Sequence, residues 1–88
     1  MTKNNKLCKI VKKILQNKKN VRFNDVDNLL KEFNYTVNQS NAGTSHYVYR
    51  KKEHSPITIP YKRPFIKECY IKEIIDILNL EEFYEKNC

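Results

Sequence analysis

The sequence predicts an α+β domain in which two helices flank three antiparallel strands, with one additional helix at the N-terminus. Three observations support this prediction. Apolar residues recur at helical spacing in three separate segments, the spacing changes to strand-like alternation between the second and third, and turn-forming residues separate the alternating runs. After the leading helix the predicted order is therefore α-β-β-β-α, with a three-stranded antiparallel sheet and the helices on one of its faces.

The leading helix is predicted over residues 7–15, where an apolar stripe lies opposite several lysines. The polar run at residues 16–20 ends this pattern. We therefore divide the chain into an N-terminal helical extension, residues 1–20, and a main domain, residues 21–88. The stripe consists of Leu7, Ile10, Val11, Ile14 and Leu15.

The two helices of the main domain follow the same reasoning. Asn24 is the predicted N-cap of the first, with Asp25 and Asp27 in its first turn, where acidic groups complement the helix dipole. The last helix follows Pro64, and residues 80–84 either extend it or form a short terminal turn. The apolar stripes of these helices are Val26, Leu29, Leu30 and Phe33 in the first, and Ile71, Ile74, Ile75 and Leu78 in the second.

The predicted strands cover residues 35–38, 45–51 and 57–59, and Pro60 stops the third. A polar loop at residues 39–44 contains Gly43, the single glycine, and residues 54–56 mark a turn. This order of elements matches that of double-stranded-RNA-binding-like domains.

Alternation along the middle strand assigns its side chains to two faces. His46, Val48 and Arg50 share one face, and because an arginine does not fit a small core, we expect that face to be open to solvent. Tyr47 and Tyr49 lie on the other face, where we expect them to pack against the helices. Stacking of these two rings on RNA bases is the alternative.

Charge and length indicate the class of partner. The chain has 88 residues, enough for one domain, and 17 basic against 10 acidic residues give a formal net charge of +7. Such a domain attracts polyanions, and nucleic acid is the partner we expect first. An anionic membrane surface or an acidic protein would also satisfy the charge.

Several function classes are disfavoured. Cys8, Cys69 and Cys88 are widely spaced and odd in number, which predicts free thiols in a reducing compartment. With two histidines, the chain lacks metal-ligand spacing, so neither a metal nor another cofactor is expected. We see no signal peptide and no apolar run of the roughly 20 residues that a membrane span needs, so we expect a cytoplasmic protein without membrane contact.

The segment around His46 is the best candidate for chemistry. An accessible imidazole titrates near neutrality and can move protons, while neighbouring cations hold a phosphate. His54, in the predicted turn, is expected to be an ordinary surface residue. The same holds for the helix charges Glu68, Glu73 and Asp76. The predicted RNA-binding residues around His46 are Arg50 and Lys67 first, then Lys51, Lys52, Lys62, Arg63 and Ser45.

Three segments, in order, resemble the HicA family of toxin–antitoxin mRNA interferases. Residues 22–26, with the apolar stripe that follows, resemble the first helix of the family's domain. Residues 43–50, Gly-Thr-Ser-His-Tyr-Val-Tyr-Arg, resemble its signature of a glycine-containing loop, Ser-His, an aromatic residue and a basic residue. Ile66-Lys67 and the isoleucines after them resemble the last helix. The resemblance covers about two-thirds of the chain, and the leading helix resembles an extension found in part of the family.

The resemblance implies a double-stranded-RNA-binding-like fold, translation-independent cleavage of mRNA without a metal, and a HicB-type antitoxin that covers the active site. DNA would be contacted only through the antitoxin complex. The family's catalytic histidine corresponds to His46. Many members have a second histidine where this chain has Tyr47, and a glycine where it has Thr44. The resemblance therefore leaves the general acid of the reaction unassigned.

Two other functions remain open at this stage. The chain could be a non-catalytic RNA-binding module of the same fold, which would use the basic residues and not His46. It could also be a protein-interaction domain that docks a partner on the apolar stripe of the leading helix.

Overall fold

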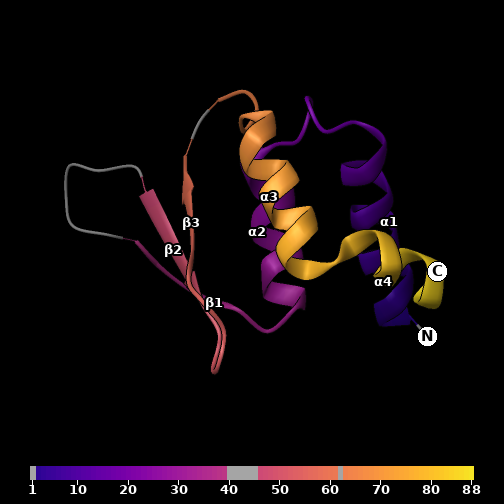
Figure 1. Cartoon of the computed structure of the whole chain (residues 1–88). Helices are drawn as coiled ribbons and strands as arrows, with labels where there is room; N and C mark the ends of the chain where they lie inside the picture. The colour runs from indigo at the N-terminus through magenta and orange to yellow at the C-terminus, as the bar shows by residue number, and fades with distance from the viewer. Residues whose placement is uncertain (1, 40–45, 62) are drawn as a thin grey trace.

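The computed structural model describes residues 2–39, 46–61 and 63–88, and within these ranges it contains four helices and one three-stranded antiparallel sheet. The α+β class and the order of elements are therefore confirmed. None of the helices in these ranges is both long and apolar enough to cross a membrane. The helices are α1 (Thr2–Gln16), α2 (Phe23–Glu32), α3 (Glu68–Leu78) and α4 (Leu80–Asn87), and the strands are β1 (Thr36–Gln39), β2 (His46–Arg50) and β3 (Ile57–Pro60) (Figure 1).

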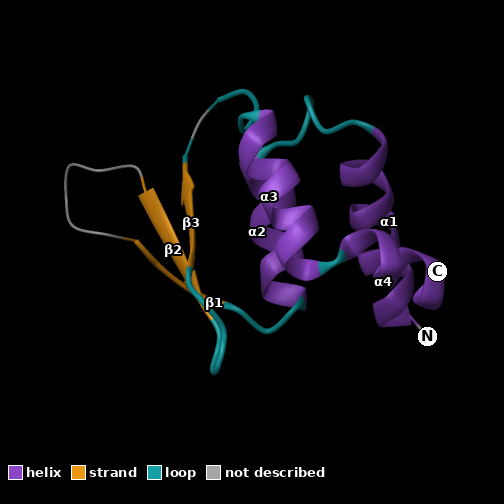
Figure 2. Cartoon of the chain, in the orientation of Figure 1, coloured by secondary structure: helices purple, strands orange, loops and turns teal. Residues whose placement is uncertain are grey.

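The elements form three successive layers (Figure 2). The sheet, in the order β1-β2-β3, is one outer layer. Helices α2 and α3 lie against one of its faces, and α1 and α4 lie beyond them, away from the sheet (Figure 1). The chain termini are close together on this outer helical layer. The opposite face of the sheet is covered by none of the four helices.

The strand register separates the two faces of the sheet. In the central strand, Tyr49 pairs with Val37 of β1 and Ile57 of β3, and Tyr47 pairs with Ile59. Tyr49, Ile57 and Ile59 are buried, and Tyr47 is half-buried against the core. The prediction that the two tyrosines pack towards the helices is therefore confirmed.

One hydrophobic core connects all three layers. Side chains of α2 and α3 fill its middle, with Leu29, Leu30 and Ile71 completely buried. Leu7, Val11 and Ile14 of α1 belong to the same cluster and are also buried. The apolar stripe of the leading helix is therefore occupied by the chain's own core. The expectation that this stripe docks a partner protein is wrong, because three of its five side chains are buried in the core and the other two, Ile10 and Leu15, are partly buried against it.

The start of α2 differs from the prediction by two residues. The helix begins at Phe23, and its N-cap is Arg22 rather than Asn24. The carboxylate of Asp25 accepts a hydrogen bond of 3.1 Å from the backbone N–H of Arg22, which satisfies a donor that the helix leaves unpaired. Asp25 lies in the first turn as predicted, whereas Asp27 lies one turn further on.

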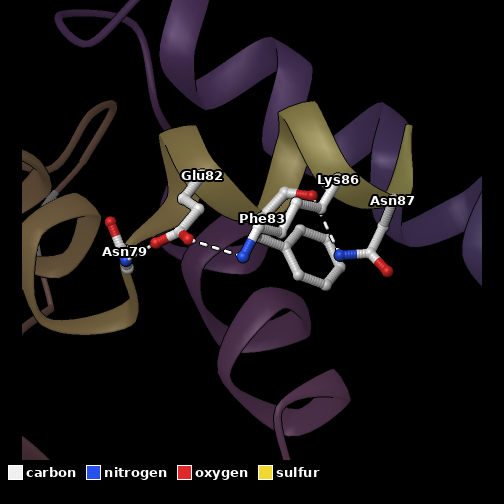
Figure 3. Close-up of polar contacts among 5 residues, drawn as sticks. All are labelled: Asn79, Glu82, Phe83, Lys86 and Asn87. Carbon is white, nitrogen blue, oxygen red and sulfur yellow. Dashed lines mark hydrogen bonds and ion pairs between the residues drawn. The ribbon is translucent and has the colours of Figure 1, made fainter.

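The C-terminal residues form a separate helix. Asn79 has a left-handed backbone conformation, with φ of 54°, and this ends α3 and starts α4 in a new direction. The side-chain amide of Asn79 donates to Glu82 (Figure 3), and the backbone N–H of Phe83 donates to the carbonyl of Asn79. Along α4, Lys86 pairs with Glu82 at 2.7 Å, and the Asn87 amide donates to the Phe83 carbonyl.

The cysteine prediction is wrong for two of the three residues. A disulfide joins Cys8 of α1 to Cys88 at the C-terminus, while Cys69 is a free and exposed thiol. The bonded residues are 80 positions apart in sequence. Their pairing follows from the side-by-side packing of α1 and α4, which no local spacing of cysteines could indicate.

Candidate nucleic-acid interface

The face of the sheet that lies away from the helices is the first part of the candidate site. On β2 it presents His46, Val48 and Arg50, as the alternation predicts, and both His46 and Arg50 are exposed. The residues paired with them extend this surface across the sheet. They are Thr36 and Asn38 on β1, and Thr58 and Pro60 on β3. We call these seven residues the open face; they include an imidazole, a guanidinium and neutral polar groups.

His46 and Arg50 lie at opposite ends of this surface. His46 is the first residue of β2, opposite Pro60, and Arg50 is the last, opposite Thr36. Four residues of extended chain separate their Cα atoms by about 13 Å. Since side chains stand roughly perpendicular to a sheet, a phosphate held next to His46 would lie beyond Arg50 unless the arginine leaned along the strand. The two residues can contact one polyanion, but at different phosphates.

The cations that follow β2 belong to the Arg50 end of the sheet. Lys51 is half-buried, with its ammonium 5.6 Å from the centre of the Tyr35 ring. Lys52 is exposed in the turn to β3, and its carbonyl lies 2.8 Å from Nδ1 of His54. His54 is exposed in the same turn, so the two histidines of the chain lie at opposite ends of the strands.

Arg63 belongs to the His46 end of the sheet. It follows Pro60, which pairs with His46, by three residues. Its Nε donates a hydrogen bond of 2.7 Å to the hydroxyl of Tyr61, and its guanidinium carbon lies 5.5 Å from the centre of the Tyr61 ring. Lys67 is exposed at the N-cap of α3. The backbone of Ile66, just before it, is hydrogen-bonded to Val21, which places Lys67 near the start of α2.

Two of the predicted RNA-binding residues, Ser45 and Lys62, lie outside the residues that the structure describes, as does the predicted loop at 39–44 apart from Gln39, which belongs to β1. The carboxylates set aside as helix charges are all on α3. Glu73 and Asp76 are exposed, and Glu68 pairs with Lys72 at 3.7 Å. Within the described ranges, no three His, Cys, Asp or Glu side chains are grouped so that they could hold a metal ion.

An aromatic cluster next to Arg63 was not anticipated from the sequence. The ring of Phe23 lies 4.9 Å from the rings of both Tyr47 and Tyr61, measured between centroids. Tyr47 and Tyr61 are 6.3 Å apart. In the sequence Phe23 directly follows Arg22, and Tyr61 begins the run Tyr61-Lys62-Arg63. Interleaved aromatic and basic residues are the signal that could have identified this cluster.

A polar contact behind the open face connects the sheet to α2. The Tyr49 hydroxyl donates a hydrogen bond of 2.8 Å to Asp27, which also pairs with Lys31 at 3.0 Å. Burial, followed by this hydrogen bond and the negative charge of Asp27, raises the pKa of Tyr49 far above that of an ordinary tyrosine. Tyr49 is therefore neutral at physiological pH and supports β2 without taking part in proton transfer.

Comparisons with protein-family models, with curated proteins and with solved structures found no significant match to this chain. The function is therefore argued from the residues and their placement.

Proposed function

We propose that this chain is a metal-independent endoribonuclease that cleaves mRNA and blocks translation, acting as the toxin of a type II toxin–antitoxin pair. The observation that carries the proposal is the position of His46. It is exposed at the end of the central strand, on the open face of a basic domain, within a segment that resembles the HicA signature. The proposal includes a double-stranded-RNA-binding-like fold for residues 21–88, with α1 as the N-terminal extension.

The reaction we propose needs one group that can both take and return a proton. His46 removes the proton of a ribose 2′-hydroxyl, and the oxygen attacks the adjacent phosphorus. The bond from phosphorus to the 5′-oxygen of the next nucleotide breaks, and that oxygen receives the proton back from His46. The products are a 2′,3′-cyclic phosphate and a 5′-hydroxyl. Cations near the His46 end of the sheet, and not Arg50, stabilise the negative charge of the transition state.

The proposed partner is a HicB-type antitoxin whose acidic surface covers the open face and thereby excludes RNA. Both partners would act in the cytoplasm, where mRNA is found.

The test compares two histidine variants. Wild type, His46→Ala and His54→Ala are expressed from a tight promoter, and the purified proteins are incubated with RNA in the presence of a chelator. We expect wild type and His54→Ala to arrest growth and to leave cyclic phosphate ends, and His46→Ala to do neither. His54→Ala is a matched control because it removes the other exposed imidazole. Equal cleavage by His46→Ala would contradict the proposal.

The second candidate function is a non-catalytic RNA-binding module. It is favoured by the separation of the two histidines, because His54 is too far along the sheet to act as the acid for a reaction at His46. Steep salt dependence of RNA binding, equal in wild type and His46→Ala and without any cleavage, would support this function instead.

A further inference from the structure

An open pocket lies where the segment after β3 meets the start of α2. Its volume is about 380 Å³, within the range of sites that bind small molecules. The first wall is the start of α2 with the residue before it, and the second is the segment between β3 and α3. The pocket is lined by Arg22, Phe23, Asn24, Tyr61, Arg63 and Pro64.

The lining is positively charged. Among the lining residues that the structure describes, two are arginines and none is acidic. The hydrogen bond from Arg63 to the Tyr61 hydroxyl uses Nε, so it does not use the two terminal nitrogens of the guanidinium. The nearest carboxylate in sequence, Asp25, is bound to the backbone of Arg22 and to Lys13 at 3.0 Å, and it is not part of the lining. Such a pair of guanidinium groups suits a phosphate, which accepts paired N–H donors.

The lining also offers a surface for a planar ring. Tyr61 is 36% exposed, although its ring is held edge-on by Phe23 and its hydroxyl by Arg63. A ring fixed in this way loses little conformational freedom when a base stacks on it. Asn24, beside these rings, carries a side-chain amide that can both donate and accept hydrogen bonds at the edge of a base. A phosphate site next to a stacking surface is the chemistry of a nucleotide.

The pocket and His46 share one end of the sheet. Tyr61 directly follows Pro60, the strand partner of His46, and Tyr47, the neighbour of His46, packs in the same aromatic cluster as Tyr61. His46 belongs to the open face, whereas Tyr47 and the pocket belong to the helical side. Because β3 is an edge strand, a nucleic-acid strand can pass from one side to the other around it.

We infer that this pocket binds one nucleotide of single-stranded RNA, next to the phosphate that His46 acts on. Arg22 and Arg63 bind the phosphate of this nucleotide, its base stacks on Tyr61, and Asn24 contacts the edge of the base. This inference rests on the proposed function for the position of the cut, but the binding itself does not require cleavage. The pocket would then contribute to the sequence preference of the nuclease.

The binding test uses the full chain carrying His46→Ala, so that RNA stays intact, and a short fluorescent single-stranded RNA. We expect Arg63→Gln to weaken binding about tenfold and to lower the salt slope by about one. Tyr61→Ala is expected to weaken binding about tenfold with an unchanged salt slope, because stacking releases no counterions. Lys86→Gln, on α4 in the outer layer, removes the same charge and is expected to bind like the parent. Thermal unfolding by circular dichroism checks that each variant is folded.

A second measurement locates the site. The four nucleoside 5′-monophosphates are titrated into isotope-labelled protein, and we expect the amide signals of Asn24, Tyr61 and Arg63 to shift. The inference would be overturned if the Arg63→Gln and Tyr61→Ala variants bound RNA as tightly as the Lys86→Gln variant does. It would also be overturned if this pocket bound polyglutamate but not RNA. RNA binding that depends on the pocket, without cleavage by wild type, would support the inference and contradict the nuclease. If wild type, Tyr61→Ala and Arg63→Gln all cleaved RNA at the same rate and bound it with the same affinity, the inference would be overturned and the proposed nuclease would not.

Discussion

The Tyr49 hydroxyl on β2 donates a hydrogen bond of 2.8 Å to the carboxylate of Asp27 on α2. Tyr49 is completely buried, whereas the residues on either side of it in β2, Val48 and Arg50, point to the open face. This bond therefore connects the central strand, which begins at His46, to the middle layer of helices.

Removing the Tyr49 hydroxyl should destabilise the fold without affecting the open face directly. We expect Tyr49→Phe to lower the free energy of unfolding by about 1–2 kcal/mol, because a hydrogen bond to a charged acceptor is lost while Asp27 keeps Lys31 as a partner. Urea denaturation measures the change, and Tyr84→Phe on α4 removes the same atom elsewhere. A loss of less than a few tenths of a kcal/mol would show that the bond contributes little.

Alkaline pH should destabilise the protein through its buried tyrosines. The pKa of Tyr49 is raised by burial and by Asp27, and that of Tyr35 is raised by burial. In the unfolded chain a tyrosine has a pKa of about 10. The stabilisation is therefore fully present below about pH 10 and is lost as the pH rises above it, because only the unfolded state then ionises. Denaturation as a function of pH checks this, and Tyr49→Phe should make the loss less steep.

The disulfide should contribute to stability in oxidising solution. Cys8 and Cys88 close a loop of 80 residues, and restricting the unfolded chain to this extent is worth about 4.5 kcal/mol at most. We expect Cys8→Ser to lower the free energy of unfolding by about 2–4 kcal/mol and Cys69→Ser to change it little. Added reductant should lower the free energy of unfolding of wild type to that of Cys8→Ser, and both proteins should remain folded. Thiol titration that finds all three cysteines free in non-reduced wild type would contradict the bond.

Arg50 should contribute to RNA binding and not to the chemical step. Because it lies about 13 Å from His46 along β2, we expect Arg50→Gln to weaken RNA binding, to lower the salt slope by about one, and to leave kcat unchanged. Single-turnover cleavage at saturating protein separates the two effects. A fall in kcat comparable to that of His46→Ala would show that Arg50 reaches the reacting phosphate.

Most of the secondary structure could be predicted because it depends on residues close together in sequence. The apolar spacing in α2 and α3 and the alternation in β2 are repeated patterns, so helix order and strand faces followed from them. Errors arose where neighbouring residues compete. Asn24 is a good capping residue, but the carboxylate of Asp25 reaches back to Arg22 and makes that residue the cap. The break at Asn79 depends on its left-handed backbone, so the pattern allowed a longer last helix or a short terminal turn and did not predict the separate helix α4.

Local pattern was enough to place His46 and Arg50 on one face of β2 and at its two ends, and the arginine indicated that this face is open to solvent. Packing between the layers brings together residues that are distant in sequence. It joins Cys8 to Cys88 and buries Leu7, Val11 and Ile14 of the α1 stripe. It also assembled Arg22, Tyr61 and Arg63 around one pocket. These contacts depend on how layers pack across long stretches of chain, and local periodicity contains no information about that packing.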